Sequence, residues 1–116
     1  MKILKIAVCD LSGIDNSKKH FFSKWNGKAS ITVSGDLYLD FMESSVTKGK
    51  AMHQLQQYFG LSEDECMAFG DNYNDIDMLK SVKYAYVMDT ACEDIKKYAY
   101  DTTEWVEGTL RKEFNI

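Results

Sequence analysis

The sequence has no uninterrupted apolar run approaching the ~20 residues that a helix needs to span a bilayer. Its first ten residues, MKILKIAVCD, contain no signal-peptide core, because lysines interrupt the apolar stretch. A basic stripe is absent too, since the 14 basic and 18 acidic residues are spread along the chain and give a net charge of −4. We therefore expect neither a membrane nor a nucleic-acid partner.

Cysteine is scarce, and the three that occur form no CxxC pair. Cys9, Cys66 and Cys92 are far apart and odd in number, which argues against a disulfide framework. Each stands beside apolar residues, and this predicts buried free thiols in a reducing compartment. We expect the protein to be cytoplasmic.

The apolar content of the chain is sufficient for a hydrophobic core. The chain has 116 residues, of which 45% are hydrophobic and 13% aromatic, as in globular proteins. This length suits one domain or a piece of a larger one.

Residues 1–43 predict an antiparallel α+β unit. β-Branched residues, helical spacing of aromatics and two alternating segments around the turn Ser34-Gly35-Asp36 indicate a β-α-β-β order. The expected strand, helix and two hairpin strands are 3–9, 15–25, 29–33 and 37–41.

Residues 44–116 show a different pattern, in which helices and strands alternate. Such alternation predicts βαβ units and a parallel sheet, although about three strands are few for a sheet covered on both faces. Thr47 is a good N-cap and Gly60 a good C-terminal residue for the first helix. Five aromatic residues are expected in the core rather than in a binding site: Phe21, Phe22, Trp25, Tyr58 and Phe59. The expected helices are 48–59, 74–80, 92–98 and 104–112, and the strands are 66–69, 84–87 and 100–102.

The most informative segment is FGDNYNDIDML, residues 69–79, which follows the apolar strand. Three aspartates so close together repel one another unless a cation lies among them. One interpretation is an Asx-rich turn that caps the next helix. A calcium loop fails, because the required positions hold Tyr73, Ile76 and Val82. The third interpretation is a magnesium site beside a phosphate.

Lys48 favours the third interpretation. It stands in the first turn of a helix, where a lysine beside the helix N-terminal amides is suited to an anion. It precedes Asp71 by one helix and one strand, so both belong to the same end of neighbouring elements.

These residues carry a family resemblance. The stretch VTKGKAMHQLQQYFGLSEDECMAFGDNYNDIDML resembles the C-terminal half of the haloacid dehalogenase superfamily, specifically its Cof-type sugar-phosphate phosphatases. Thr47-Lys48-Gly49-Lys50 resembles the lysine motif, and Gly70, Asp71, Asn74 and Asp75 match its GDxxND motif. SITVSGDLYLDFME resembles the closing hairpin of the family's cap domain. The resemblance implies a partial Rossmann-like core in residues 44–116, preceded by a cap remnant in residues 1–43.

The resemblance also implies chemistry. An aspartate attacks phosphorus and water then hydrolyses the aspartyl-phosphate. Asp71 would hold Mg²⁺ directly, and Asp75 would hold a metal-bound water or the loop. Asn74 would hydrogen-bond the phosphoryl group, and Lys48 would neutralise charge between the nucleophile and the phosphate.

The nucleophile is the open question. Asp10 in AVCDLSGID follows an apolar strand and mimics the family's DxDGT motif, with Ser12 in place of the second aspartate. The competing interpretation, which we favour, makes residues 3–9 a cap strand and Asp10–Gly13 a loop into the cap helix.

On that interpretation the chain is a fragment of a Mg²⁺-dependent phosphohydrolase for small phosphorylated metabolites. It would lack the nucleophile, bind Mg²⁺ weakly and be inactive alone. We expect it to form a homo-oligomer or to bind a partner that supplies the other half of the core. The alternative is a non-catalytic binding or dimerising module.

Overall fold

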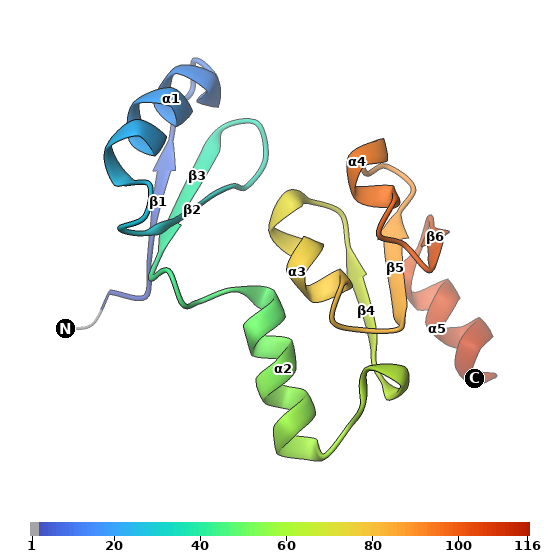
Figure 1. Ribbon diagram of the computed structural model, residues 1–116. Helices are drawn as coiled ribbons and strands as arrows, with labels where there is room; N and C mark the ends of the chain where they lie inside the picture. Colours follow the sequence, from blue (N-terminus) through green and yellow to red (C-terminus); the bar gives the residue numbers. More distant parts are fainter. Residues whose placement is uncertain (1–2) are drawn as a thin grey trace. The chain divides into compact units, whose positions relative to one another are not determined.

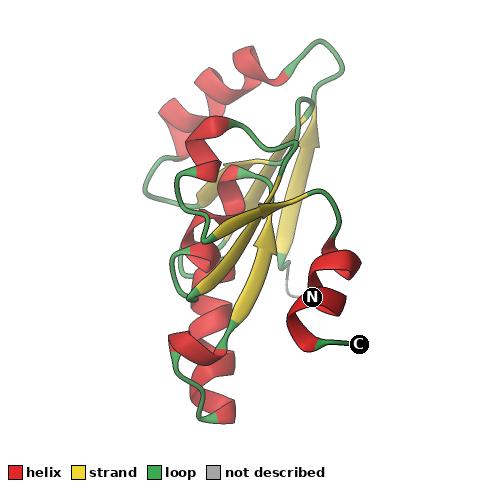
Figure 2. Ribbon diagram, turned by 90° about the vertical axis from the view of Figure 1, so that its right-hand side faces the viewer, coloured by secondary structure: helices red, strands yellow, loops and turns green. Residues whose placement is uncertain are grey.

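The structure is a computed structural model that describes residues 3–116. The chain divides into two compact units, Met1–Thr47 and Lys48–Ile116. Figure 1 follows the elements along the chain and Figure 2 separates helices from strands by colour. Among residues 3–116, no helix combines the length and the apolar character that crossing a membrane requires.

The first unit has the predicted β-α-β-β order. Its three strands form an antiparallel sheet in the order β1-β3-β2, so the last strand lies in the middle. The predicted hairpin is confirmed, with Ser34 and Gly35 in the turn between its strands. The elements are β1 (Lys5–Cys9), α1 (Ile14–Trp25), β2 (Ser30–Val33) and β3 (Tyr38–Met42).

The two faces of this sheet differ. Side chains alternate along β3, so Leu39 and Phe41 share one face and Asp40 lies on the other. The apolar face packs on α1, where the Phe21 and Phe41 rings meet edge to face with centroids 5.2 Å apart. On the other face Lys5 Nζ lies 2.9 Å from the buried Asp40 carboxylate.

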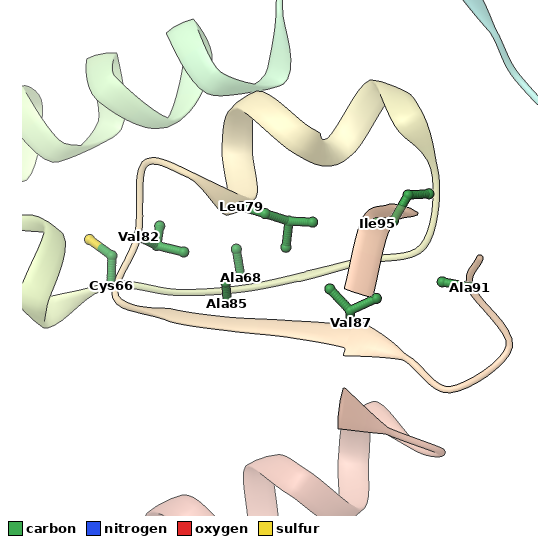
Figure 3. Packing of buried hydrophobic residues seen from close by; sticks show 8 residues of the cluster. All are labelled: Cys66, Ala68, Leu79, Val82, Ala85, Val87, Ala91 and Ile95. Atoms are coloured by element: carbon green, nitrogen blue, oxygen red, sulfur yellow. The ribbon is translucent and has the colours of Figure 1, made fainter. Parts of the chain in front are cut away.

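The second unit is α/β, as the alternation of elements predicts. Its three strands form a parallel sheet in the order β4-β5-β6, with Met67 opposite Tyr84 and Tyr86 opposite Asp101. Figure 3 shows α3 over one face of the strands and α5 over the other. The elements are α2 (Lys48–Phe59), η1 (Glu63–Glu65), β4 (Met67–Gly70), η2 (Tyr73–Asp75), α3 (Ile76–Leu79), β5 (Tyr84–Met88), α4 (Glu93–Lys96), β6 (Asp101–Thr103) and α5 (Val106–Phe114).

The core of this unit lies between the sheet and α3. Leu79, Val87 and Ile95 are its largest fully buried side chains. They come from α3, β5 and α4, so burying them fixes these short helices, which have little stability of their own. The whole cluster is shown in Figure 3: Cys66, Ala68, Leu79, Val82, Ala85, Val87, Ala91 and Ile95.

Aromatic rings cover the opposite face. Phe69 and Tyr86 stack with centroids 5.4 Å apart, and Tyr100 meets Tyr84 and Tyr86 edge to face at 5.3 and 5.9 Å. Burial raises the pKa of Tyr86 to about 12, helped by a hydrogen bond to Glu113 on α5. That hydrogen bond ties the last helix to the middle strand.

Three of the expected core aromatics are not buried. Trp25, the last residue of α1, is 41% exposed. Tyr58 is 82% exposed and Phe59 62% exposed. Helix α2 turns only a narrow stripe inward, with Gly49 and Gln56 buried and Met52 partly buried. Tyr58 lies off this stripe, and Phe59 ends the helix. The prediction was wrong for all three residues, and for Tyr58 and Phe59 the reason is that α2 is covered on one side only.

The prediction of buried thiols was also wrong in part. All three cysteines are free, but Cys66 alone is buried, whereas Cys9 and Cys92 are exposed. Cys9 ends the edge strand β1 and Cys92 is the N-cap residue of α4. Both positions lie at the ends of elements, where an apolar neighbour in the sequence does not ensure burial.

Candidate functional site

The predicted site residues of the second unit gather at one end of the sheet. Lys48 begins α2, and Gly70 ends β4. Asp71, Asn74 and Asp75 follow in the loop and the short η2 helix. This is the carboxyl end of a parallel strand, where open α/β sheets bind their ligands.

Asp75 connects these pieces. Its side chain is buried, and its Oδ1 forms an ion pair with Lys48 Nζ. Its Oδ2 accepts hydrogen bonds from the backbone N–H groups of Asp71, at 2.9 Å, and Asn72, at 3.1 Å. Burial alone would raise the pKa of Asp75, but the hydrogen bonds from Lys48, Asp71 and Asn72 outweigh it and hold the pKa below its usual value.

Two glycines make this arrangement possible. A Cβ on Gly70 would lie 2.7 Å from the Cβ of Asp75, so any larger residue would push the buried carboxylate out of place. A Cβ on Gly49 would lie 2.7 Å from the Cβ of Asp77 and 2.8 Å from its backbone carbon. Gly49 therefore lets the first turn of α2 approach α3 closely enough for Lys48 to reach Asp75.

A buried glutamine holds the same helix further along. Gln56 Nε2 donates to the Ser81 carbonyl at 2.7 Å, and Gln56 Oε1 lies 3.1 Å from His53 Nδ1. Ser81 follows α3, so the hydrogen bond joins the middle of α2 to the end of α3. Gln56 was not among the predicted site residues, although a glutamine in line with Gly49 and Met52 on the inner stripe was a usable signal.

Asp71 and Asn74 differ in their surroundings. The Asp71 carboxylate belongs to an exposed residue, whereas Asn74 is partly buried. Asn74 Oδ1 is shielded from solvent and has no hydrogen-bond partner. An unpaired buried polar atom costs about 1–3 kcal/mol, so this carbonyl oxygen marks a position where a hydrogen-bond donor fits.

A second contact at this end of the sheet was also missed. The Tyr73 hydroxyl lies 3.5 Å from Cys92 Sγ and links the loop after β4 to the start of α4. This interaction with Cys92 raises the pKa of Tyr73. The spacing of Tyr73 and Cys92 in the sequence does not predict this contact, because it depends on the conformations of two separate loops.

The donors of this site do not make a complete magnesium site by themselves. Both oxygens of Asp75 already accept hydrogen bonds, which leaves Asp71 as the available carboxylate of the 71–75 loop. Between residues 3 and 116 there is no group of three or more His, Cys, Asp or Glu side chains that could hold a metal ion. Mg²⁺ needs a near-octahedral set of oxygens, so the fit is incomplete.

Asp10 belongs to the first unit. Its Oδ1 accepts hydrogen bonds from the N–H and Oγ of Ser12, at 3.0 and 2.6 Å, and its Oδ2 accepts one from Ser17 Oγ at 2.5 Å. These hydrogen bonds lower the pKa of Asp10, with the Ser12 hydroxyl as the largest cause. The carboxylate thus joins the end of β1 to the start of α1.

Comparisons with known proteins agree with the geometry of the second unit. A family model for haloacid dehalogenase-like hydrolases matches residues 1–108. A Haemophilus influenzae protein provisionally named a phosphatase is 44% identical over 70 residues, which are 60% of this chain and 27% of that protein. An Escherichia coli HMP-PP phosphatase is 30% identical over 95 residues, covering 81% of this chain and 37% of the enzyme.

A solved structure shows the same fold. The crystal structure of a Streptococcus mutans protein superposes with a TM-score of 0.83 at 27% identity, covering 97% of this chain and 45% of that one. The chain therefore spans less than half the length of each of these three relatives. The matched sequence, the parallel sheet and the site at its carboxyl end lead to one conclusion: this chain belongs to the haloacid dehalogenase-like hydrolase family.

Proposed function

We propose that this chain supplies the phosphate-binding side of a phosphatase active site. The observation that carries the proposal is the buried Asp75 carboxylate, which holds Lys48 against the loop that contains Asp71 and Asn74. A fixed cation, helix N-terminal amides and the Asn74 side-chain amide at one end of the sheet suit the oxygens of a phosphoryl group.

Each residue has a proposed role. Lys48 binds the phosphoryl oxygens and stabilises the charge that develops on them during transfer. Asn74 donates a hydrogen bond to the same group. Asp71 offers an exposed carboxylate to Mg²⁺, and Asp75 supports both by fixing Lys48 and the loop rather than by touching the substrate.

The two units have different proposed origins in the family. We assign residues 1–43 to the cap domain and residues 44–116 to the C-terminal half of the Rossmann-like core. The substrate class is a small phosphorylated metabolite. Support comes from the E. coli relative, whose name gives HMP-PP as its substrate. The free thiols of Cys9, Cys66 and Cys92 support a reducing compartment such as the cytoplasm.

Asp10 is not the proposed nucleophile. Its two oxygens already accept three hydrogen bonds from Ser12 and Ser17, which hold the turn before α1. It follows a strand of an antiparallel sheet, whereas Lys48 and Asp75 lie at the end of a parallel one. We infer that residues 1–116 bind phosphate without cleaving its esters, and that a further polypeptide segment completes the site.

A non-catalytic binding module is the second candidate. It is favoured by the outward side of α2, where Leu55, Tyr58 and Phe59 are 53%, 82% and 62% exposed. An exposed apolar surface of this kind is typical of interaction sites. The two candidates differ in whether Lys48 and the 70–75 loop bind phosphate.

Inorganic phosphate is the probe that separates them. Titration followed by amide NMR should shift the signals of residues 70–75 and of the first turn of α2. The shifts should disappear in Lys48→Met and return in part in Lys48→Arg, which keeps the charge. Lys83→Met is the matched control, because Lys83 is a half-exposed lysine of the same unit that pairs with Asp64 instead. Shifts that survive Lys48→Met would contradict the proposal.

A further inference from the structure

Trp105 is exposed, although its backbone is held firmly. It is the N-cap residue of α5, follows β6 by two residues and is 59% exposed. Its N–H donates to Thr103 Oγ1 at 3.1 Å, and this hydroxyl donates to the Trp105 carbonyl at 3.2 Å. Thr103 is buried, and its hydroxyl also lies 2.7 Å from Thr109 Oγ1. A buried hydroxyl group therefore fixes the residue that carries the exposed ring.

Gly108 supports the ring itself. A Cβ on Gly108 would lie 2.7 Å from Trp105 Cε3 and 3.3 Å from Cζ3, so the benzene ring of the indole packs against the glycine. More than half of the side chain remains open to solvent. A ring that is held in place before binding loses little conformational freedom in a complex, and tryptophan is enriched among the residues that dominate binding energies. The position is therefore suited to contact with a partner.

The surroundings of Trp105 are acidic. Asp89 lies beside this segment, because its N–H donates to the Thr103 carbonyl at 2.9 Å. Asp89 and Glu104 are exposed, and in the described part of the chain neither forms an ion pair with a lysine or arginine. Residues 100–110 contain three acidic side chains and no basic one: Asp101, Glu104 and Glu107. A group that contacts Trp105 from outside therefore meets negative charge.

An arginine matches this surface. Its planar guanidinium stacks on aromatic faces and pairs with carboxylates through parallel N–H groups, and a lysine is a poor substitute at such a position. A second copy of this chain does not provide one, since its single arginine, Arg111, pairs with Glu107 at 3.0 Å. We propose that Trp105, Glu104 and Asp89 form a docking surface for a basic segment of a different protein, in which one arginine stacks on Trp105. Strand β6 lies at the opposite edge of the sheet from β4, so this inference goes beyond the proposed function and does not depend on it.

The indole NMR signals of the whole chain test the contact. The probe is a peptide of glycines with two arginines, one for each free carboxylate. The control is the same peptide with citrulline, which keeps the shape of arginine but carries no charge. We expect the arginine peptide to shift the Trp105 indole signal saturably, and the citrulline peptide to bind roughly tenfold more weakly. The signal of Trp25 should not move, because this ring is 41% exposed but already has Lys28 Nζ 5.9 Å from its centroid.

Protein variants locate the contact. Gly108→Ala keeps every group that meets the peptide but displaces the indole ring, so it should weaken binding roughly tenfold. Asp89→Asn combined with Glu104→Gln should also weaken binding roughly tenfold at low salt. Glu63→Gln combined with Asp77→Asn is the matched control, because it removes the same charge from η1 and α3 and should leave binding unchanged. Circular dichroism confirms that each variant is folded.

Equal binding of the arginine and citrulline peptides would overturn the proposal, as would unchanged binding by Gly108→Ala or by the variant of Asp89 and Glu104. So would free arginine amide that binds as tightly as the peptide, because the surface would then take a small molecule rather than a protein segment. The titration contains neither phosphate nor metal. A failure of phosphate binding at Lys48 therefore leaves this result unaffected, and the two proposals can fail separately.

Discussion

At the scale of single residues, Asp75 has the largest predicted effect. It is buried, carries a charge and satisfies Lys48 and two backbone N–H groups at once. Asp75→Asn keeps the size but loses the charge, and hydrogen bonds to charged groups contribute about 1.5–3 kcal/mol each. We expect urea denaturation to show a loss of about 1.5–3 kcal/mol, with Asp77→Asn, an exposed neighbour, as the control.

The same residue sets a pH dependence. Its folded-state pKa is lower than its unfolded-state value of about 3.9, so its stabilisation is complete above that value. The contribution is lost as the pH falls through the folded-state pKa. The difference in unfolding free energy between the native chain and Asp75→Asn should be constant above about pH 5 and shrink below about pH 4. A difference that grew on acidification would show that the charged form is not the stabilising one.

The predicted affinity for Mg²⁺ depends on Asp71. With both Asp75 oxygens engaged, the 71–75 loop offers Mg²⁺ one carboxylate, and Mg²⁺ gives up its waters reluctantly. Titration calorimetry should show weak binding, in the millimolar rather than the micromolar range, reduced further by Asp71→Ala. Micromolar affinity that is abolished by Asp71→Ala would mean that the site is complete within this chain.

At the scale of elements, the approach of α2 to α3 positions Lys48. Gly49→Ala would place a Cβ 2.7 Å from the Asp77 Cβ and 2.9 Å from the Asp77 carbonyl oxygen, neither of which can move freely. Overpacking of this kind costs about 1–3 kcal/mol, and the displaced helix should also weaken phosphate binding. Thermal denaturation and the phosphate titration measure the two effects.

Gly60→Ala is the matched control. Gly60 follows α2 with a φ of 68° and has open space around its Cβ position. Alanine there has a conformational cost of about 1–2 kcal/mol but clashes with nothing. It should therefore lower stability without changing phosphate binding. If both variants weakened phosphate binding equally, the close contact at Gly49 would not be what positions Lys48.

The elements themselves were largely predictable, because their order depends on local patterns. The hairpin follows from alternation around Ser34-Gly35-Asp36, and the parallel sheet from the alternation of strands and helices. The predictions that failed concern the burial of side chains, which depends on which side of an element is covered by the rest of the chain. Tyr58 and Phe59 fit a helical spacing, yet periodicity does not say whether a partner surface reaches them.

The candidate site was predictable to a similar degree. The motif residues place Lys48 and the acidic loop at one end of the sheet, and the structure brings Lys48 to Asp75. Three other features depend on side-chain directions and loop geometry. They are the hydrogen bonds to both oxygens of Asp75, the buried Gln56 and the Tyr73–Cys92 contact. Spacing in a sequence does not contain that information.

At the scale of the whole molecule, the central claim is that the phosphate-binding groups and the nucleophile are not both in residues 1–116. Lys48, Asn74 and Asp71 would gather phosphate, while Asp10 serves the turn before α1. Loss of the nucleophile lowers turnover by about a million-fold in a well-studied hydrolase. Unactivated water would then be the only attacking group.

A phosphatase assay on the purified chain tests this claim most directly. With p-nitrophenyl phosphate and Mg²⁺, we predict no turnover above a blank that contains the metal alone. Asp10→Asn, checked by circular dichroism, should give the same result as the native chain. Magnesium-dependent turnover that disappears in Asp10→Asn while the fold remains intact would contradict the account, because it would make Asp10 the nucleophile of a complete phosphatase.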